Sequence, residues 1–291
     1  MAKERERLDV LMVQQGLAPS REKAKASIMA GLVFAGNERL DKAGLEMPVS
    51  TVLELRGDIL PFVSRGGLKL AKAVKVFDLS FVDRVVADIG ASTGGFTDCA
   101  LQNGARKVYA IDVGYGQLDW KLRTDSRVIT LERLNARYLT TDSLPEQVDW
   151  VVCDVAFISV VKILPAMRAI LKDSGQVMTL IKPQFEAGRE NVGKKGVVRD
   201  PLVHTQVLNY VLSEAERHSF RVKGLDYSPI RGPEGNIEYL AWLANNIPSS
   251  AEIIDRHSSE PRTANCERLL WQPMLGDLVE RAQKETEKQH G

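Results

Sequence analysis

Most of the chain, residues 81–245, alternates short apolar runs with amphipathic stretches. The runs have the length and the β-branched content of strands, and the stretches between them have helical spacing. This alternation predicts an α/β domain with a doubly wound, mostly parallel sheet that helices cover on both faces. The last two runs, RVKGLDYSPI and NIEYLAWLA, are separated by a Gly/Pro-rich turn and predict an antiparallel end to the sheet.

The first 58 residues predict a separate small α+β unit. Helical spacing starts at Leu8, and a second short helix follows Ser20, which is a good N-cap residue. The runs LVFA and TVLEL, with a turn at Gly36-Asn37 after the first of them, are expected to pair as a hairpin. Such a unit is too small to bury a large core of its own.

Two further segments flank the large domain. Residues 59–80 are expected to be a linker, with a tight turn at Gly66-Gly67, followed by a helix over LKLAKAVKVF. In that helix Lys72 and Lys75 are expected to face solvent. Residues 246–291 are expected to be a C-terminal extension with a helix around RLLWQPMLGDLVERAQKE that Pro273 interrupts. No role is assigned to this extension.

Composition narrows the class of protein. The chain has 291 residues, of which 44% are hydrophobic and 26% charged, an ordinary balance for a soluble protein. No stretch approaches the roughly 18 apolar residues of a membrane helix, and the start MAKERERLDV does not read as a secretory signal. Cys99, Cys153 and Cys266 form neither a disulfide framework nor a CxxC pair, so we expect a cytoplasmic protein without a metal site.

The strongest local motif is DIGASTGGF, from Asp88 to Phe96, at the end of the first predicted strand of the large domain. Its glycines permit a tight turn and the close approach of a ligand to backbone N–H groups. Asp112 ends the next strand, where it can accept hydrogen bonds from ribose hydroxyls. This combination predicts a cofactor that contains adenosine.

The order of residues in the turn indicates which adenosine-containing cofactor is expected. A dinucleotide-binding turn reads GxGxxG, whereas this one reads GxxxGG and follows an acidic residue, Asp88. That carboxylate would repel a pyrophosphate, but it could meet a cationic cofactor through its own charge or through a bridging water. S-adenosylmethionine carries an ammonium and a sulfonium and is therefore favoured. The expected cofactor-binding residues are Asp88, Gly90, Ser92, Thr93, Gly94, Gly95, Phe96, Asp112, Asn135 and Asp154, although Asn135 could equally be a turn-forming residue.

Basic residues near the N-terminus lie in a specific string, RLDVLMVQQGLAPSREKAKASIMAGLVFAGN. This string resembles the small RNA-binding module of small-subunit ribosomal protein four, also called the alpha-L motif. The resemblance implies contacts with structured RNA, whereas charge alone is equally compatible with a solvated helix face. The candidate RNA-binding residues are Arg7, Arg21, Lys23, Lys25 and, in a basic cluster before the large domain, Arg65.

The strings DIGASTGGFTD, CDVAFIS and LIKPQFE resemble motifs of the FtsJ-like ribose 2′-O-methyltransferases. Together with the small module, residues 5–245 resemble the TlyA family, long labelled haemolysin A and associated with ribosomal RNA 2′-O-methylation. The resemblance implies a Rossmann-like methyltransferase sheet, S-adenosylmethionine as cofactor, and structured RNA, above all rRNA in a ribosomal subunit, as partner.

The family's reaction uses a Lys–Asp–Lys–Glu tetrad, and the matching catalytic candidates are Lys69 in SRGGLKL, Asp154 in VVCDV, Lys182 in LIKP and Glu238 in GNIEYL. A ribose 2′-hydroxyl must lose its proton as it attacks a methyl carbon, and an ammonium beside it stabilises the developing charge. Lys182 is expected to activate the hydroxyl. Asp154 is expected to hold Lys182, and the other two residues to complete a paired-charge network.

Other functions stay open at this point. An RNA base methyltransferase could use Cys153, but a buried strand cysteine is the simpler interpretation, and DVAF replaces the Asn/Asp-Pro-Pro-aromatic string of amino-group enzymes. A cytolysin would need a membrane segment, which this sequence does not show. A noncatalytic RNA-binding or assembly protein would not need the tetrad. Residues 185–199, rich in glycine and basic residues, could be a substrate loop or a solvated connection. The modified nucleotide and the oligomeric state are not encoded in these patterns.

Overall fold

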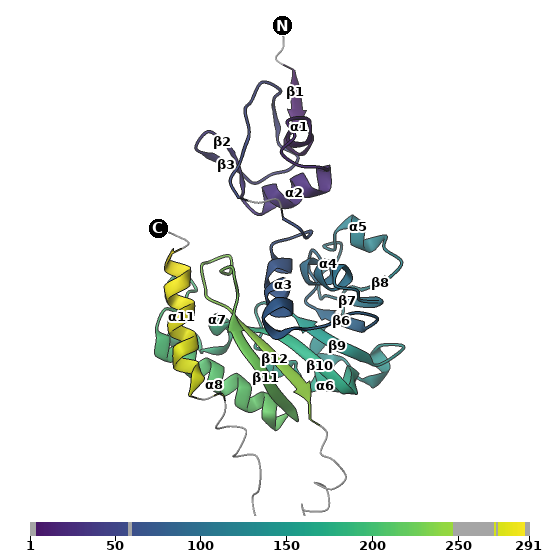
Figure 1. The fold of residues 1–291 in the computed structure, drawn as a ribbon, viewed down its shortest axis with the longest axis vertical. Coiled ribbons are helices and arrows are strands. Elements are labelled where there is room, and N and C mark those ends of the chain that lie inside the picture. Colours follow the sequence, from purple (N-terminus) through teal and green to yellow (C-terminus); the bar gives the residue numbers. More distant parts are fainter. Residues whose placement is uncertain (1–3, 58–59, 247–270, 272, 289–291) are drawn as a thin grey trace, which may run out of the picture.

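The computed structural model describes residues 4–57, 60–246, 271 and 273–288. Two units are visible, a small one at the N-terminus and a larger one built around a twisted sheet (Figure 1). Helix α3, Gly66–Phe77, follows the short connection between them and packs on the larger unit.

The small unit packs two short helices over a core of its own. Helix α1 is Leu8–Gln14 and helix α2 is Arg21–Met29, and Leu8, Met12 and Ile28 are completely buried between them and the strands. Ser20 caps α2, as predicted, by accepting a hydrogen bond from the backbone N–H of Lys23 at 3.3 Å. The strands are β1 (Arg5–Arg7) paired with β4 (Glu46–Pro48), and β2 (Val33–Ala35) between β3 (Glu38–Leu40) and β5 (Glu54–Leu55).

The predicted pairing of LVFA with TVLEL is present as the antiparallel contact of β2 with β5, but the strand β3, which forms the hairpin with β2 at Gly36-Asn37, was not predicted. Strand β2 pairs with β3 directly across the turn at Gly36-Asn37, and TVLEL contributes only the short β5 on the other edge of β2. Gly36 has a φ of +60°, which suits a turn that reverses the chain within two residues. Such a turn pairs neighbouring segments, and Leu40 of β3 then enters the core.

The larger unit contains a seven-stranded sheet in the order β11-β12-β10-β9-β6-β7-β8. All neighbouring strands are parallel except β12, which runs antiparallel to both β10 and β11. The predictions of a doubly wound sheet and of an antiparallel end are therefore confirmed. The strands are β6 (Val85–Ile89), β7 (Lys107–Ile111), β8 (Val128–Leu131), β9 (Val148–Cys153), β10 (Leu171–Ile181), β11 (Phe220–Tyr227) and β12 (Tyr239–Asn245).

Helices cover both faces of this sheet and create two apolar cores. One core receives α3 and α4, and the other receives α6 and α8. Each central strand is buried on both sides, which explains the continuous apolar runs in the sequence. The helices are α4 (Gly95–Gln102), α5 (Trp120–Arg123), α6 (Leu164–Ile170), α7 (Pro183–Glu186) and α8 (Pro201–Arg217), with 3-10 turns at Ala136–Tyr138, Thr141–Ser143, Val160–Lys162 and Arg189–Asn191.

The described helix of the C-terminal extension packs on this domain. Helix α11, Met274–Lys288, packs against α8 and β11, and Leu275, Leu278 and Val279 are buried in the second core. Trp271 is helical, Pro273 lies in a turn and α11 begins at Met274, so the predicted interruption at Pro273 is confirmed. The portion of the predicted helix at residues 268–270 lies outside the described residues.

The segment before the large domain differs from its prediction at the glycines. Gly66 and Gly67 are the first residues of α3, so the tight turn expected there was wrong. A Cβ atom on Gly67 would lie 2.4 Å from Cγ of Phe62, so glycine allows this ring to pack on the helix. Lys72 also differs, because it pairs with Asp226 at 3.0 Å and is half-buried.

Candidate active site

The four residues of the predicted tetrad meet in the structure. Asp154 follows β9, Lys182 follows β10, Glu238 directly precedes β12, and Lys69 lies in α3. Lys69 Nζ is 3.1 Å from Asp154 Oδ2 and 2.6 Å from Glu238 Oε2. Lys182 Nζ is 2.6 Å from Asp154 Oδ1 and 4.0 Å from Glu238 Oε1. The two ammonium groups and the two carboxylates therefore form one network.

This network is almost completely removed from solvent. Lys69 is 7% exposed and Glu238 is 1% exposed. Burial disfavours the charged form of Lys69, but Asp154 and Glu238 outweigh it and raise the pKa of Lys69 above its usual value. Burial likewise opposes ionisation of Asp154, but Lys69 and Lys182 lower its pKa below the usual range. The charged forms of these groups stabilise one another, so removing one would leave others buried without a partner.

Glycines of the DIGASTGGF turn allow the tetrad to assemble. Gly90 has a φ of +82°, and a Cβ atom on it would lie 2.7 Å from the carbonyl oxygen of Asp154. A Cβ atom on Gly95 would lie 2.7 Å from the backbone nitrogen of Gly67, in the first turn of the helix that carries Lys69. The turn thus brings β6, β9 and α3 into close contact, in addition to any contact with a cofactor.

Asp112 organises the neighbouring hollow. It accepts hydrogen bonds from the backbone N–H groups of Ser92 at 2.8 Å and of Gly114 at 2.7 Å. The carboxylate remains half-exposed, and its oxygens can each accept a further hydrogen bond. The hollow beside it is lined by Ala91, Ser92, Ala110, Asp112, Gly114, Gln117, Leu118, Thr130 and Glu132. The hollow is small, about 10 Å³, and it offers an acidic acceptor of the kind that ribose hydroxyls need.

Asp88 lies deeper than the sequence indicated. Its side chain is completely buried, and Oδ2 accepts a hydrogen bond from the Thr97 hydroxyl at 2.6 Å. Burial is the main cause that raises the pKa of Asp88 to about 7. Oδ1 has no hydrogen-bond partner among the described residues. A direct contact with the cofactor was one of the two predicted roles of Asp88. It would need an exposed carboxylate, and the Asp88 carboxylate is not exposed.

The other predicted cofactor residues fall into two groups. The Phe96 side chain is buried in the core, and a Cβ atom on Gly94 would overlap Leu122, so these two residues shape the turn from within. Ser92, with a φ of +47°, and Thr93, whose carbonyl accepts from the N–H of Asp119, are loop residues. Asn135 is exposed.

Asn135 also has the turn-forming role that was the alternative to an adenine contact. Its Oδ1 accepts a hydrogen bond from the backbone N–H of Arg137 at 3.1 Å and starts a 3-10 turn. The backbone N–H of Leu134 donates to the carbonyl of Asp112 at 3.0 Å. Asn135 therefore follows a residue that is hydrogen-bonded to the Asp112 segment.

In the small unit, Asp9 forms ion pairs with two of the candidate RNA-binding residues. Asp9 is 2% exposed and pairs with Arg7 and with Arg21, each at 2.9 Å. Burial opposes its ionisation, but the two guanidinium groups lower the pKa of Asp9. Both arginine side chains stay about half exposed, so their outer N–H groups can reach a phosphate.

Lys23 does not lie on that surface. Its Nζ donates to the carbonyl oxygens of Leu60 at 2.9 Å and of Pro61 at 2.5 Å, which ties α2 to the connection between the two units. Lys23 therefore has a contact within the chain that the sequence did not predict, and its contact with RNA stays a prediction. Lys25 and Arg65 are exposed, as an RNA contact requires.

Two aromatic residues that the sequence reasoning missed lie in the motifs of the tetrad. Phe157, three residues after Asp154, is 93% exposed and has a φ of +63°. Its ring centroid lies 5.5 Å from that of Phe185, which follows Lys182 by three residues. Each phenylalanine follows a tetrad residue by three positions, and this equal spacing could have indicated that the two rings lie close together.

A carboxylate joins the same two segments. Glu186 Oε1 accepts a hydrogen bond from the backbone N–H of Val160 at 2.7 Å, between the segment after β9 and helix α7. Burial raises the pKa of Glu186, and hydrogen bonds with Ser159 and Val160 partly oppose this. Glu186 therefore holds the loops of Asp154 and Lys182 together.

The cysteines do not form a second reactive centre. Cys99 and Cys153 are buried, and burial raises the pKa of each thiol to about 12. A thiolate nucleophile is therefore disfavoured at Cys153, as expected for a strand cysteine. Cys266 lies outside the described residues.

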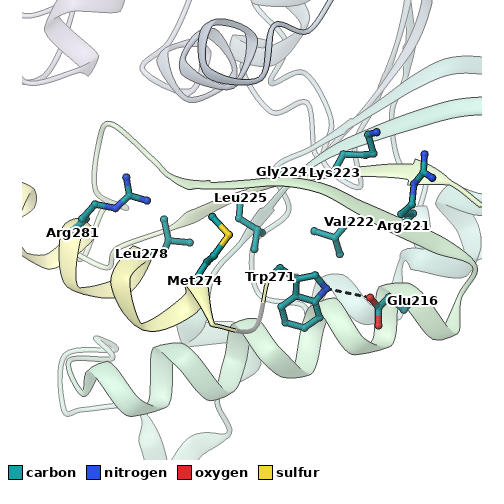
Figure 2. Close-up of a pocket in the computed structure, with 10 residues that line it drawn as sticks. All are labelled: Glu216, Arg221, Val222, Lys223, Gly224, Leu225, Trp271, Met274, Leu278 and Arg281. Carbon is teal, nitrogen blue, oxygen red and sulfur yellow. Dashed lines mark hydrogen bonds between the residues drawn. The ribbon is translucent and has the colours of Figure 1, made fainter. Parts of the chain in front are cut away.

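A cavity of about 390 Å³ lies away from the tetrad, between β11, α8 and α11 (Figure 2). Val222, Leu225 and Met274 give it an apolar lining, and the indole N–H of Trp271 donates to Glu216 at 3.2 Å. None of the predicted site residues lines it. This cavity belongs to the packing of the C-terminal helix on the edge of the sheet.

Comparison with known proteins places the chain in a family. The model of the FtsJ-like methyltransferase family matches residues 62–245, and that of the S4 domain matches residues 6–50. The chain is 53% identical over 247 residues to Bacillus subtilis YqxC, named as a proposed rRNA methyltransferase, with 84% of this chain and 87% of that protein covered.

Two further proteins are similar to this chain over most of their length. TlyA of Mycobacterium tuberculosis, named a 16S/23S rRNA (cytidine-2′-O)-methyltransferase, is 41% identical over 82% of this chain and 90% of its own. A solved structure from Streptococcus thermophilus, named as a proposed hemolysin, is 46% identical, with a TM-score of 0.74 over 99% of each chain. The chain belongs to the TlyA family and has the FtsJ-like methyltransferase domain.

Proposed function

We propose that the protein transfers a methyl group from S-adenosylmethionine to a ribose 2′-hydroxyl of ribosomal RNA. The observation that supports this best is the buried Lys69–Asp154–Lys182–Glu238 network at the carboxyl edge of the sheet. Ligands of doubly wound sheets bind at this edge. TlyA and YqxC both match most of this chain. The name of TlyA supports the same reaction and substrate, and the name of YqxC supports methylation of rRNA.

S-adenosylmethionine fits the residues beside the network. The half-exposed Asp112 carboxylate can accept from ribose hydroxyls, and the apolar wall at Ala91 and Leu118 suits an adenine. When bound, this cofactor supplies an electrophilic methyl group on its sulfonium. Asp88 would contribute indirectly, since its hydrogen bond with Thr97 holds strand β6 to the first turns of α4.

Within the network, Lys182 is the residue best placed to act on the hydroxyl. Lys69 lies within 3.1 Å of oxygens on both carboxylates, whereas Lys182 approaches only Asp154 that closely. An ammonium group has three N–H donors, so Lys182 retains donors for a further oxygen. A fixed cation at that oxygen stabilises the negative charge that develops as the hydroxyl loses its proton. Asp154 keeps Lys182 in place.

The RNA would be held by surfaces outside this network. Arg7, Arg21 and Lys25 of the small unit are exposed to different degrees and suit phosphate contacts, which position a protein on RNA without reading its sequence. The exposed Phe157 ring suits stacking with an unpaired base. No helix within the described ranges is long and apolar enough to cross a membrane. The cytoplasmic location stays a prediction.

The test is to incubate unmethylated 16S and 23S rRNA transcripts and ribosomal subunits with methyl-labelled S-adenosylmethionine. Nucleosides from the digested RNA are then separated. Label in a 2′-O-methylnucleoside supports the proposal. Label in a base supports a base methyltransferase, and RNA binding without label in any nucleoside supports a noncatalytic role. Lysis of erythrocytes by the same preparation would support the cytolysin.

A further inference from the structure

Two loops meet beside Glu238, and one buried asparagine joins them. Asn236 Oδ1 accepts from the backbone N–H of Val198 at 3.0 Å, and its Nδ2 donates to the carbonyl of Gly196 at 2.8 Å. Asn236 is buried. The glycine-rich loop of residues 193–199 is therefore attached to the segment that leads into β12 and Glu238. Of the two interpretations of residues 185–199, this attachment argues against a freely solvated connection.

The same two loops carry cations. Lys194 and Lys195 are exposed in the first loop, and neither forms an ion pair with a described residue. Arg231 lies in the second loop, next to Gly232. A Cβ atom on Gly232 would lie 2.8 Å from Glu238 Oε1, so this loop packs directly against the catalytic network.

Arg231 has an unusual environment for a guanidinium group. It is half-buried, and its Nε is inaccessible to solvent and has no hydrogen-bond partner among the described residues. Its one hydrogen bond is a long one, from Nη1 to the carbonyl of Gly235 at 3.4 Å. Glu234 lies in the same loop but forms no ion pair with it within the part of the chain that the structure describes. A partly desolvated cation without a carboxylate partner is costly, and an anion that binds there would lower this cost.

We propose that Arg231, with Lys194 and Lys195, forms a binding surface for the RNA backbone that holds the phosphates next to the reacting ribose. The chemistry fits, because a guanidinium binds a phosphate through two parallel N–H groups and lysines add point charges beside it. The position fits as well, because the phosphodiester groups flank the 2′-hydroxyl on which Lys182 acts. This inference rests on the proposed function for the identity of the RNA.

The experiment measures binding of a 23S rRNA transcript to the full-length protein by filter binding between 50 and about 300 mM KCl. Removing one phosphate contact reduces the slope of log affinity against log salt by about one. We therefore expect R231A to lower affinity about five- to tenfold and the slope by about one. R231K is expected to recover the slope, and K194A/K195A to lower it by about two.

The matched control is R221A. Arg221 lies at the other end of β11, is exposed, and lines the cavity shown in Figure 2. It should leave the affinity and the salt slope unchanged. S-adenosylmethionine affinity, measured by calorimetry, should be unaltered in all four variants, which separates RNA binding from a disturbed tetrad.

An R231A protein that binds the transcript with the wild-type affinity and slope would overturn the inference. This outcome is distinct from failure of the proposed function. If only the proposed function fails, the wild-type protein still binds RNA with the expected salt dependence and R231A still weakens this binding, but no 2′-O-methylnucleoside forms.

Discussion

The small N-terminal unit and the large methyltransferase domain use charged residues in opposite ways. In the small unit, Arg7 and Arg21 keep about half of their side-chain surface exposed around a buried carboxylate, Asp9. In the large domain, Lys69 and Lys182 are buried and paired with the buried Glu238 and the partly buried Asp154. Exposed charges contribute to RNA affinity, and salt screens this contribution. Buried, fixed charges instead stabilise the charge that develops during the reaction. The comparison therefore predicts different consequences for the same substitution in the two places.

The largest effect is expected for Lys182→Ala. The substitution removes the cation expected at the reacting oxygen and leaves Asp154 with one ammonium partner instead of two. Methyl transfer to rRNA should fall about 10²–10³-fold or more, the usual loss for one such donor. Lys75→Ala, an exposed change on α3, is the control and should retain full activity. Near-normal turnover by a folded K182A protein would remove Lys182 from its assigned role.

A smaller effect is expected for Asp112→Ala, which addresses the cofactor side of the large domain. A charged acceptor of hydrogen bonds is worth about 1.5–3 kcal/mol, so S-adenosylmethionine affinity should fall about 10- to 150-fold. Calorimetry measures this directly. Asp142→Ala changes an exposed acid outside the hollow and should bind normally. Unchanged affinity of D112A would show that the carboxylate does not contact the cofactor.

In the small unit, the double variant Arg21→Ala/Lys25→Ala should weaken RNA binding several-fold. Two lost phosphate contacts should lower the salt slope by about two. R221A/K223A, on the edge strand of the other domain, is the matched control. The interpretation fails if the Michaelis constant for RNA and its salt dependence stay at the wild-type values.

The last prediction concerns the stability of the fold, and its sign follows from the pKa of Asp88. The folded-state pKa of about 7 lies above the unfolded value of 3.8, so the folded protein binds this proton more tightly. The free energy of unfolding should therefore decrease by about 1 kcal/mol per pH unit as pH rises from about 4 to 7. Urea unfolding of wild type and Asp88→Asn across this range tests it. The variant should lack this slope, whereas the exposed change Asp142→Asn should keep it.

The sequence predicted the large domain better than the small one, and the difference has a physical cause. The strands of the large domain are buried on both sides and appear as continuous apolar runs, and the tetrad lies at their ends. Strands β2, β3 and β5 have two or three residues each, and their pairing depends on one turn. The domain limits at residues 58, 80 and 245 stay predictions.

Side-chain partners were the part that sequence patterns could not give. Nothing in the string REKAKA distinguishes Lys23, which binds carbonyls of the connection, from Lys25, which is exposed. Asp88 and Asp112 both lie at the ends of strands. Only the structure shows that the Asp88 side chain is buried and accepts a hydrogen bond from Thr97. The resemblance to a family supplied the tetrad, and the fold explains why its members meet.

One measurement tests the division between affinity and chemistry most directly, namely single-turnover methyl transfer at saturating rRNA by R21A/K25A and K182A side by side. The account predicts that R21A/K25A reaches the wild-type rate constant once RNA is saturating, because its exposed charges contribute to binding. It predicts that K182A stays slow at every RNA concentration, because its buried charge acts in the reaction. A reduced rate constant for R21A/K25A at saturation, or recovery of K182A at high RNA concentration, would contradict it.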